Sequence, residues 1–291
     1  MITITDVRAV PGDSAFLLDD GQTSILYDSG FAFTGEAVAD KINNILKDRE
    51  LDYIFLTHSH YDHVLGAVYV ARRFPHVKIV AGEYAAGIFT KDSAKHVMRD
   101  LDRKFALKCG VNEYEDLIDC LRVDIPVKDG DTIFAGDLVF RAIDLPGHTK
   151  CSVGFYCEKE KLLLSTETLG VCDGEGGVIP CYLVGYAMTL ASISRVQDLH
   201  PERILVPHYA VLDKEAAESY LSKARKAAVE TKEYICDEIR KGKSKDEISA
   251  SIISYFRNDY VRAIYPEDAM QLNTGIMIEL IRRECLDWHI E

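Results

Sequence analysis

The chain has 291 residues, of which 47% are hydrophobic and 28% charged, as is typical of a globular protein. Its formal net charge of −13 argues against a nucleic-acid partner, because binding phosphates requires Lys and Arg. No apolar run reaches the roughly 18 residues of a membrane span, and the N-terminal stretch lacks the layout of a signal peptide. We therefore expect a cytoplasmic protein without a membrane partner. The eight scattered cysteines form no CxxC pair, which predicts reduced thiols.

The first part of the chain alternates between predicted strands and helices. Apolar alternation and turn residues predict strands, and apolar spacing of three to four residues predicts helices. The strands are expected at residues 1–7, 14–20, 24–30, 51–60 and 77–82, and the helices at residues 35–48 and 62–74. The run at 51–60 is almost continuously apolar, as in a strand buried on both faces. Such alternation indicates an α/β layered architecture.

The second part of the chain returns to strands and then becomes helical. Residues 83–122 are mostly helical in pattern, and their part 90–120 is either a lid or a helix pair that covers a sheet. Strands are predicted within 132–148, 152–167 and 203–209, with a helix around 186–199. Residues 214–291 read as helices, and Ser244 with Glu247 forms a capping-box pattern. We predict a domain at 1–213 and a helical C-terminal extension at 214–291 that packs on it.

The stretch THSHYDH at residues 57–63 concentrates groups that can bind metal. His58 and His60 end the buried strand, and Asp62 and His63 begin the next helix, so all four can face one pocket. Imidazole suits zinc and iron, and a carboxylate can ligate or bridge. Four such groups in six residues suit two adjacent metals better than one. The competing interpretation is a solvated turn that happens to be rich in histidine.

Three further candidate ligands each follow a predicted strand. His148 follows a Pro-Gly turn, Glu167 ends the apolar run LLLSTE, and His208 follows ILVP. Open α/β sheets place their sites at the carboxyl ends of strands. The recurrence of ligand-type residues at strand ends favours a metal site over coincidence.

The pattern HxHxDH, with the later His148, Glu167 and His208, resembles the metallo-β-lactamase superfamily of metal-dependent hydrolases. The stretch YDSG at residues 27–30 is similar to an early Asp-x-Gly turn of that fold, where we expect Asp28 to be structural. The resemblance covers roughly residues 2–212 and implies a four-layer αββα sandwich. It implies that one metal is held by His58, His60 and His148, the other by Asp62, His63 and His208, with Glu167 bridging both.

This resemblance implies two-metal hydrolysis, in which a metal-bound hydroxide attacks a carbonyl or phosphoryl centre. Asp62 would also orient the nucleophile. We expect two divalent ions, with zinc first and iron or manganese as alternatives. The locally positive site would admit an anionic small-molecule substrate. This chain departs from the family pattern in two ways: Glu167 replaces the usual Asp, and Pro207 and Tyr209 flank His208.

Three functions stay open from the sequence. The first is hydrolysis of a small ester or thioester, since the general layout is similar to that of hydroxyacylglutathione hydrolases. The second is hydrolysis of a small phosphodiester. The third is a binding or regulatory role that keeps the metal site and acts through the helical tail.

The Gly-rich stretch 170–186 either forms a substrate-pocket wall, with Tyr182 or Tyr186 as hydrogen-bond donor, or is a connecting loop. Oligomeric state is not determined by the sequence.

Overall fold

The computed structural model describes residues 2–286, with side chains as far as residue 284. The chain divides into two compact units, residues 1–144 with 151–165 and residues 145–150 with 166–291. The predicted boundary at residue 213 falls inside the second unit, and the two-domain division stays a prediction. Within the described residues, no helix combines the length and apolarity that crossing a membrane requires.

The first unit contains a six-stranded mixed sheet whose strand order follows the chain. Its strands are β1 (Thr3–Asp6), β2 (Phe16–Asp19), β3 (Ser24–Tyr27), β4 (Tyr53–Leu56), β5 (Lys78–Gly82) and β6 (Ile125–Val127). The pairs from β1 to β3 are antiparallel and those from β3 to β6 are parallel. Because the carboxyl ends of parallel strands meet at one edge, the segments that follow β3 and β4 are neighbours.

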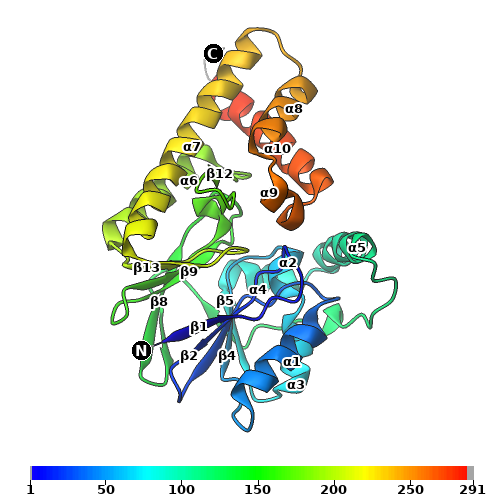
Figure 1. Ribbon diagram of the computed structural model, residues 1–291, viewed down its shortest axis with the longest axis vertical. Helices are drawn as coiled ribbons and strands as arrows, with labels where there is room; N and C mark the ends of the chain where they lie inside the picture. Colours follow the sequence, from blue (N-terminus) through cyan, green and yellow to red (C-terminus); the bar gives the residue numbers. More distant parts are fainter. Residues whose placement is uncertain (1, 287–291) are drawn as a thin grey trace. The chain divides into compact units, whose positions relative to one another are not determined.

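Helices α1 (Gly35–Leu46) and α3 (Ala67–Arg73) lie against this sheet (Figure 1). Their apolar residues, such as Val38 and Val70, join Leu26 and Ile54 of the strands in one buried core. The α/β architecture predicted from strand–helix alternation is therefore confirmed in this unit.

The single helix predicted at 62–74 is wrong in one respect, because two helices, α2 (Tyr61–Val64) and α3, occupy that stretch. Gly66 lies at the break, and its backbone N–H donates to the carbonyl of Gly30 at 3.0 Å. A Cβ atom at Gly66 would lie 1.9 Å from the carbonyl oxygen of Ser29. The close approach of these two loops requires glycine and interrupts the helix.

A second layer of strands completes the first unit. It comprises the antiparallel strands β7 (Thr132–Ala135), β8 (Leu138–Asp144), β9 (Val153–Cys157) and β10 (Leu162–Leu164). The ring of Phe55, on β4, packs edge-on against Phe140 at 5.3 Å between centroids and at a tilt against Phe155 at 4.6 Å. The predicted helical region contains α4 (Glu83–Phe89), α5 (Asp92–Lys108) and the short 3₁₀ turn Ile118–Cys120.

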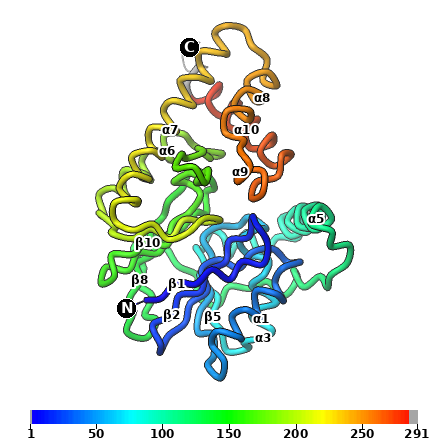
Figure 2. Tube along the Cα trace, in the orientation of Figure 1, coloured from blue at the N-terminus to red at the C-terminus, as the bar shows by residue number. Residues whose placement is uncertain are grey.

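The second unit is mainly helical. Its helices are α6 (Tyr186–Leu199), α7 (Lys214–Arg240), α8 (Lys245–Phe256), α9 (Asp259–Ile264) and α10 (Glu267–Ile281), and a π-helical turn follows at Arg282–Leu286. Two short antiparallel strand pairs are β11 (Val171–Cys172) with β12 (Val178–Ile179) and β13 (Arg203–Leu205) with β14 (Val211–Leu212). The 3₁₀ turn η2 (Glu167–Leu169) precedes β11. Figure 2 shows α7 in yellow, with α8 and α10 in orange to red beside it. Ser244 and Glu247 form the predicted capping box at the start of α8.

The seven cysteines whose side chains the structure describes are all reduced thiols, as predicted.

One buried carboxyl group ties α5 to the loop that follows β3. Asp102 is fully buried and accepts the backbone N–H of Ala32 at 2.8 Å and the hydroxyl of Tyr114. Burial raises the pKa of Asp102 from 3.8 to about 6, against the opposing effect of these hydrogen bonds.

We expect the replacement Asp102→Asn to change how stability depends on pH. Because the pKa of the Asp102 carboxyl is higher in the native state than in the unfolded state, its contribution to stability is complete below about pH 4. This contribution is lost as the pH rises through about 6. The free energy of unfolding of the variant, relative to wild type, should therefore rise by up to about 3 kcal/mol between pH 4 and 7. Urea unfolding at several pH values measures this, and a difference that does not vary with pH would contradict it.

Candidate metal centre

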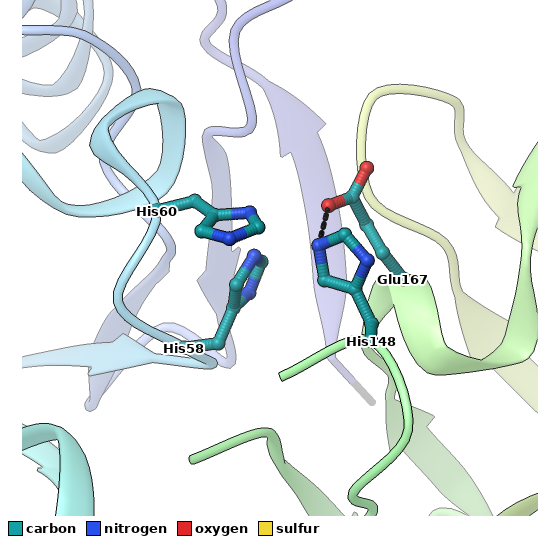
Figure 3. A group of neighbouring side chains, drawn as sticks. All are labelled: His58, His60, His148 and Glu167. Atoms are coloured by element: carbon teal, nitrogen blue, oxygen red, sulfur yellow. Dashed lines mark ion pairs between the residues drawn. The ribbon is translucent and has the colours of Figure 1, made fainter. Parts of the chain in front are cut away.

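The first unit places His58, His60, Asp62 and His63 together; we call these four residues the N-terminal half-site. The chain bends at His58 and Ser59 after β4, and the rings of His58 and His60 meet edge to face with centroids 4.6 Å apart (Figure 3). The ring centroid of His63, on α2, lies 4.1 Å from that of His58. His58 and His63 are buried, whereas His60 and Asp62 are partly exposed. This part of the predicted cluster is therefore a packed group of imidazoles and not an open, solvated turn.

Asp28 is the anchor of the N-terminal half-site. Its fully buried carboxylate lies directly after β3 and contacts Nδ1 of His63 at 2.7 Å. It also accepts the backbone N–H of Thr57 at 2.9 Å and hydrogen bonds from the hydroxyls of Thr57 and Ser14. The Thr57 hydroxyl in turn lies 3.0 Å from Nδ1 of His58. One carboxylate thus orients two imidazole rings, one directly and one through Thr57.

The second unit places His148, Glu167 and His208 together; these form the C-terminal half-site. Oε2 of Glu167 lies 2.8 Å from Nε2 of His148, the ion pair drawn in Figure 3. Oε1 of the same carboxylate lies 3.5 Å from Nε2 of His208. Glu167 is the first residue of η2, and its helix cap is the preceding Thr166. The carboxylate of Glu167 faces the two histidines, and the helix cap is supplied by its neighbour Thr166.

His148 is held on both sides by residues of its own unit. Its Nδ1 lies 3.0 Å from the carbonyl oxygen of Cys181, and its backbone N–H donates to the hydroxyl of Thr168 at 3.2 Å. Burial lowers the pKa of His148, but nearby Cys181 and Glu167 act the other way, and the pKa lies well above 6.5. The ring is fixed so that its Nε2 faces Glu167.

The way in which the rings are held fits a metal centre. Nδ1 of His58, His63 and His148 each meets a hydroxyl, carboxylate or carbonyl oxygen. Histidines that bind metal usually engage their second ring nitrogen in this way, which fixes the ring and leaves Nε2 as the ligand atom. Each half-site also contains one carboxylate, and imidazole together with carboxylate suits zinc or another divalent transition metal.

Sequence patterns did not identify the residues that anchor the rings. The YDSG turn marked Asp28 as structural, and the structure adds its contact with His63. Thr57 adjoins the motif but carries no signal of its own. The Cys181 contact uses a backbone carbonyl, which any residue type could supply. In the Gly-rich stretch 170–186, β11 and β12 form a short hairpin, and the Tyr182 ring is fully buried in an apolar cluster.

The chain belongs to the metallo-β-lactamase superfamily, whose family model matches residues 10–208, more than half of its length. A protein from Dictyostelium discoideum named glyoxylase B2 is 29% identical over 172 residues, which cover 58% of this chain and 53% of that protein. A hydroxyacylglutathione hydrolase from a Bradyrhizobium species is 25% identical over 157 residues, covering 52% and 49%. The chain thus spans about half the length of these curated relatives.

The fold agrees with this family. A metallo-β-lactamase family protein from Thermus thermophilus superimposes with a TM-score of 0.61 at 16% sequence identity. The match covers 97% of this chain and 93% of that one, so it extends over the C-terminal helices. The predicted metallo-β-lactamase fold with a helical C-terminal region is therefore confirmed, and the sequence-based resemblance is correct.

Because Asp28 accepts several buried hydrogen bonds, we expect the isosteric replacement Asp28→Asn to lower the free energy of unfolding by about 2 kcal/mol. Asn tolerates the left-handed backbone at this residue, where φ is 49°. Its side-chain amide, however, would direct N–H groups toward the hydrogen-bond donors that the Asp28 carboxylate accepts. Urea unfolding measures the effect. Asp52→Asn is the matched control, because Asp52 also accepts a strand N–H, from Ser24, but is partly exposed. Equal losses in the two variants would contradict the role assigned to Asp28.

Proposed function

We propose that the protein is a metal-dependent hydrolase that acts on a small ester or thioester. The observation that carries the proposal is the fixation of the imidazole rings in both half-sites, because a solvated turn would not need it. Membership of the superfamily supports joining the two half-sites into one centre. In this proposal one metal is bound by His58, His60 and His148 and a second by Asp62, His63 and His208, with Glu167 shared between them.

Metals bound there would make a bound water more acidic and would polarise the oxygen of the electrophile. The chain's own residues would do the rest. Asp28 and Thr57 hold two rings in place, Cys181 holds a third, and Glu167 supplies negative charge between His148 and His208. Asp62, the partly exposed carboxylate of the set, would orient the nucleophile and accept its proton.

The names of two groups of relatives favour a thioester. Hydroxyacylglutathione hydrolases from Bradyrhizobium and from Francisella tularensis strains match this chain at 25% and 28% identity.

The imidazole-rich donor set carries only the charges of Asp62 and Glu167, so two divalent ions would leave it positive and able to bind an anionic substrate. Zinc is our first choice, with iron and manganese as alternatives. The cytoplasmic location and the absence of a nucleic-acid partner stay predictions.

We expect the purified protein to contain metal and the variants His148→Ala and Glu167→Gln to bind it at least about 100-fold more weakly. His148→Ala removes one partner of the 2.8 Å contact between two candidate ligands, and Glu167→Gln replaces the carboxylate of the other by a neutral amide. Elemental analysis and competition with a chromophoric chelator measure metal content and affinity. His200→Ala is the control, because His200 is exposed and bonds only locally through Nδ1 to the carbonyl of Asp198. Unchanged affinity in the two site variants would refute the proposed centre.

A direct comparison of substrates distinguishes the leading reaction from the phosphodiesterase alternative. Protein loaded with zinc, iron or manganese is assayed in parallel with acyl-thioesters and with a chromogenic phosphodiester. We expect thiol release with at least one metal and at least about 100-fold slower phosphodiester cleavage. Treatment with a chelator should abolish turnover, and added metal should restore it. Preferential phosphodiester cleavage would replace the thioesterase proposal by the alternative.

A further inference from the structure

The C-terminal helices contact the residues that hold the C-terminal half-site. Tyr265 lies between α9 and α10, and its phenol is near the side chain of Cys181. Asn273 of α10 donates from Nδ2 to the same phenol oxygen at 2.5 Å. The carbonyl of Cys181 is the group that meets Nδ1 of His148. Asn273, Tyr265 and Cys181 therefore connect α10 to the ring of a candidate ligand, through two hydrogen bonds and the close approach of the phenol to Cys181.

A second contact of the same kind reaches His208. The hydroxyl of Tyr260, on α9, donates to the carbonyl oxygen of His208 at 3.0 Å. His208 has a φ of 60°, a left-handed conformation that a non-glycine residue adopts only when its surroundings hold it there. The rings of Tyr260 and Tyr209 also pack edge to face at 5.9 Å. The helical region thus supports the backbone on which this ligand is mounted.

The phenol of Tyr265 is held in place beside Cys181. Burial, with the nearby Cys181 and Glu167, raises the pKa of Tyr265 well above 10, so the hydroxyl keeps its proton. Asn273 donates to the phenol oxygen, which fixes the position of this hydroxyl. The side chain of Tyr265 packs against the apolar cluster of Val171, Ile179, Val261, Ile264 and Met270, which limits its movement.

We propose that Tyr260 and Tyr265 are positioning residues through which the C-terminal helices set the metal affinity of the C-terminal half-site. Tyr265, held by Asn273, acts through Cys181 on the ring of His148, and Tyr260 acts on the backbone of His208. The inference rests on the proposed function, because it requires that His148 and His208 bind metal. Outer partners of metal ligands change metal affinity without contacting the ion.

The test uses tyrosine-to-phenylalanine replacements in the full-length protein. Tyr265→Phe and Tyr260→Phe each remove one hydroxyl and leave the ring in place. Tyr234→Phe is the matched control, because its hydroxyl also hydrogen-bonds within the helical region, to Ser251 at 2.7 Å, and touches no candidate ligand. Zinc affinity is measured by competition with a chromophoric chelator, and the stability of the metal-free proteins by urea unfolding. We expect about tenfold weaker zinc binding in the first two variants and wild-type affinity in the control.

An NMR signal adds a measurement that a purely structural role would not change. The Nδ1–H proton of His148 is assigned by its loss in His148→Ala. In metal-free protein, its chemical shift should move in Tyr265→Phe and stay unchanged in Tyr234→Phe. Wild-type zinc affinity in both Tyr265→Phe and Tyr260→Phe would overturn the inference and leave the proposed function intact. Failure of wild-type protein to bind zinc, iron or manganese would instead refute the proposed function itself.

Discussion

The buried carboxylate of Asp28 is the constraint on which the N-terminal half-site depends. A charged group without solvent must be matched by hydrogen-bond donors, and Asp28 finds them in Ser14, Thr57 and His63. These donors come from three segments of the first unit, so satisfying one carboxylate also brings these segments together. The parallel pairing of β3 with β4 makes this geometry available, because Asp28 and Thr57 follow neighbouring strand ends. The orientation of His58 and His63 is a consequence of that arrangement.

The C-terminal half-site is organised differently. Glu167 lies between two histidines, and the carboxylate therefore has partners for both of its oxygens. The histidines are supported by backbone carbonyl contacts, since Cys181 meets the ring of His148 and Tyr260 holds the carbonyl of His208. The supporting helices, α9 and α10, follow the family's matched segment. A region that could be regarded as an appendage therefore takes part in holding candidate ligands.

The longer carboxylate of Glu167 fits this picture. The resemblance to the family implies Asp at this place, and the side chain of Glu167, longer by one methylene group, approaches His148 and His208 from the first turn of η2. The flanking residue Tyr209 also has a structural partner, since its ring packs on Tyr260. The two residues that depart from the family pattern, Glu167 and Tyr209, therefore lie beside residues that the C-terminal helices support.

The sequence by itself determined the α/β class, the helical C-terminal region, the capping box at Ser244 and the candidate ligands, because each depends on local spacing or on residue type. The HxHxDH motif is local, and the later candidate ligands each follow a strand. Only the tertiary structure decided the break at Gly66, the role of Asp28 and the contacts of Cys181, Tyr260 and Tyr265. The physical reason is that these features depend on contacts between segments far apart in the chain. A backbone carbonyl or a close loop approach leaves no mark in the local pattern of side chains.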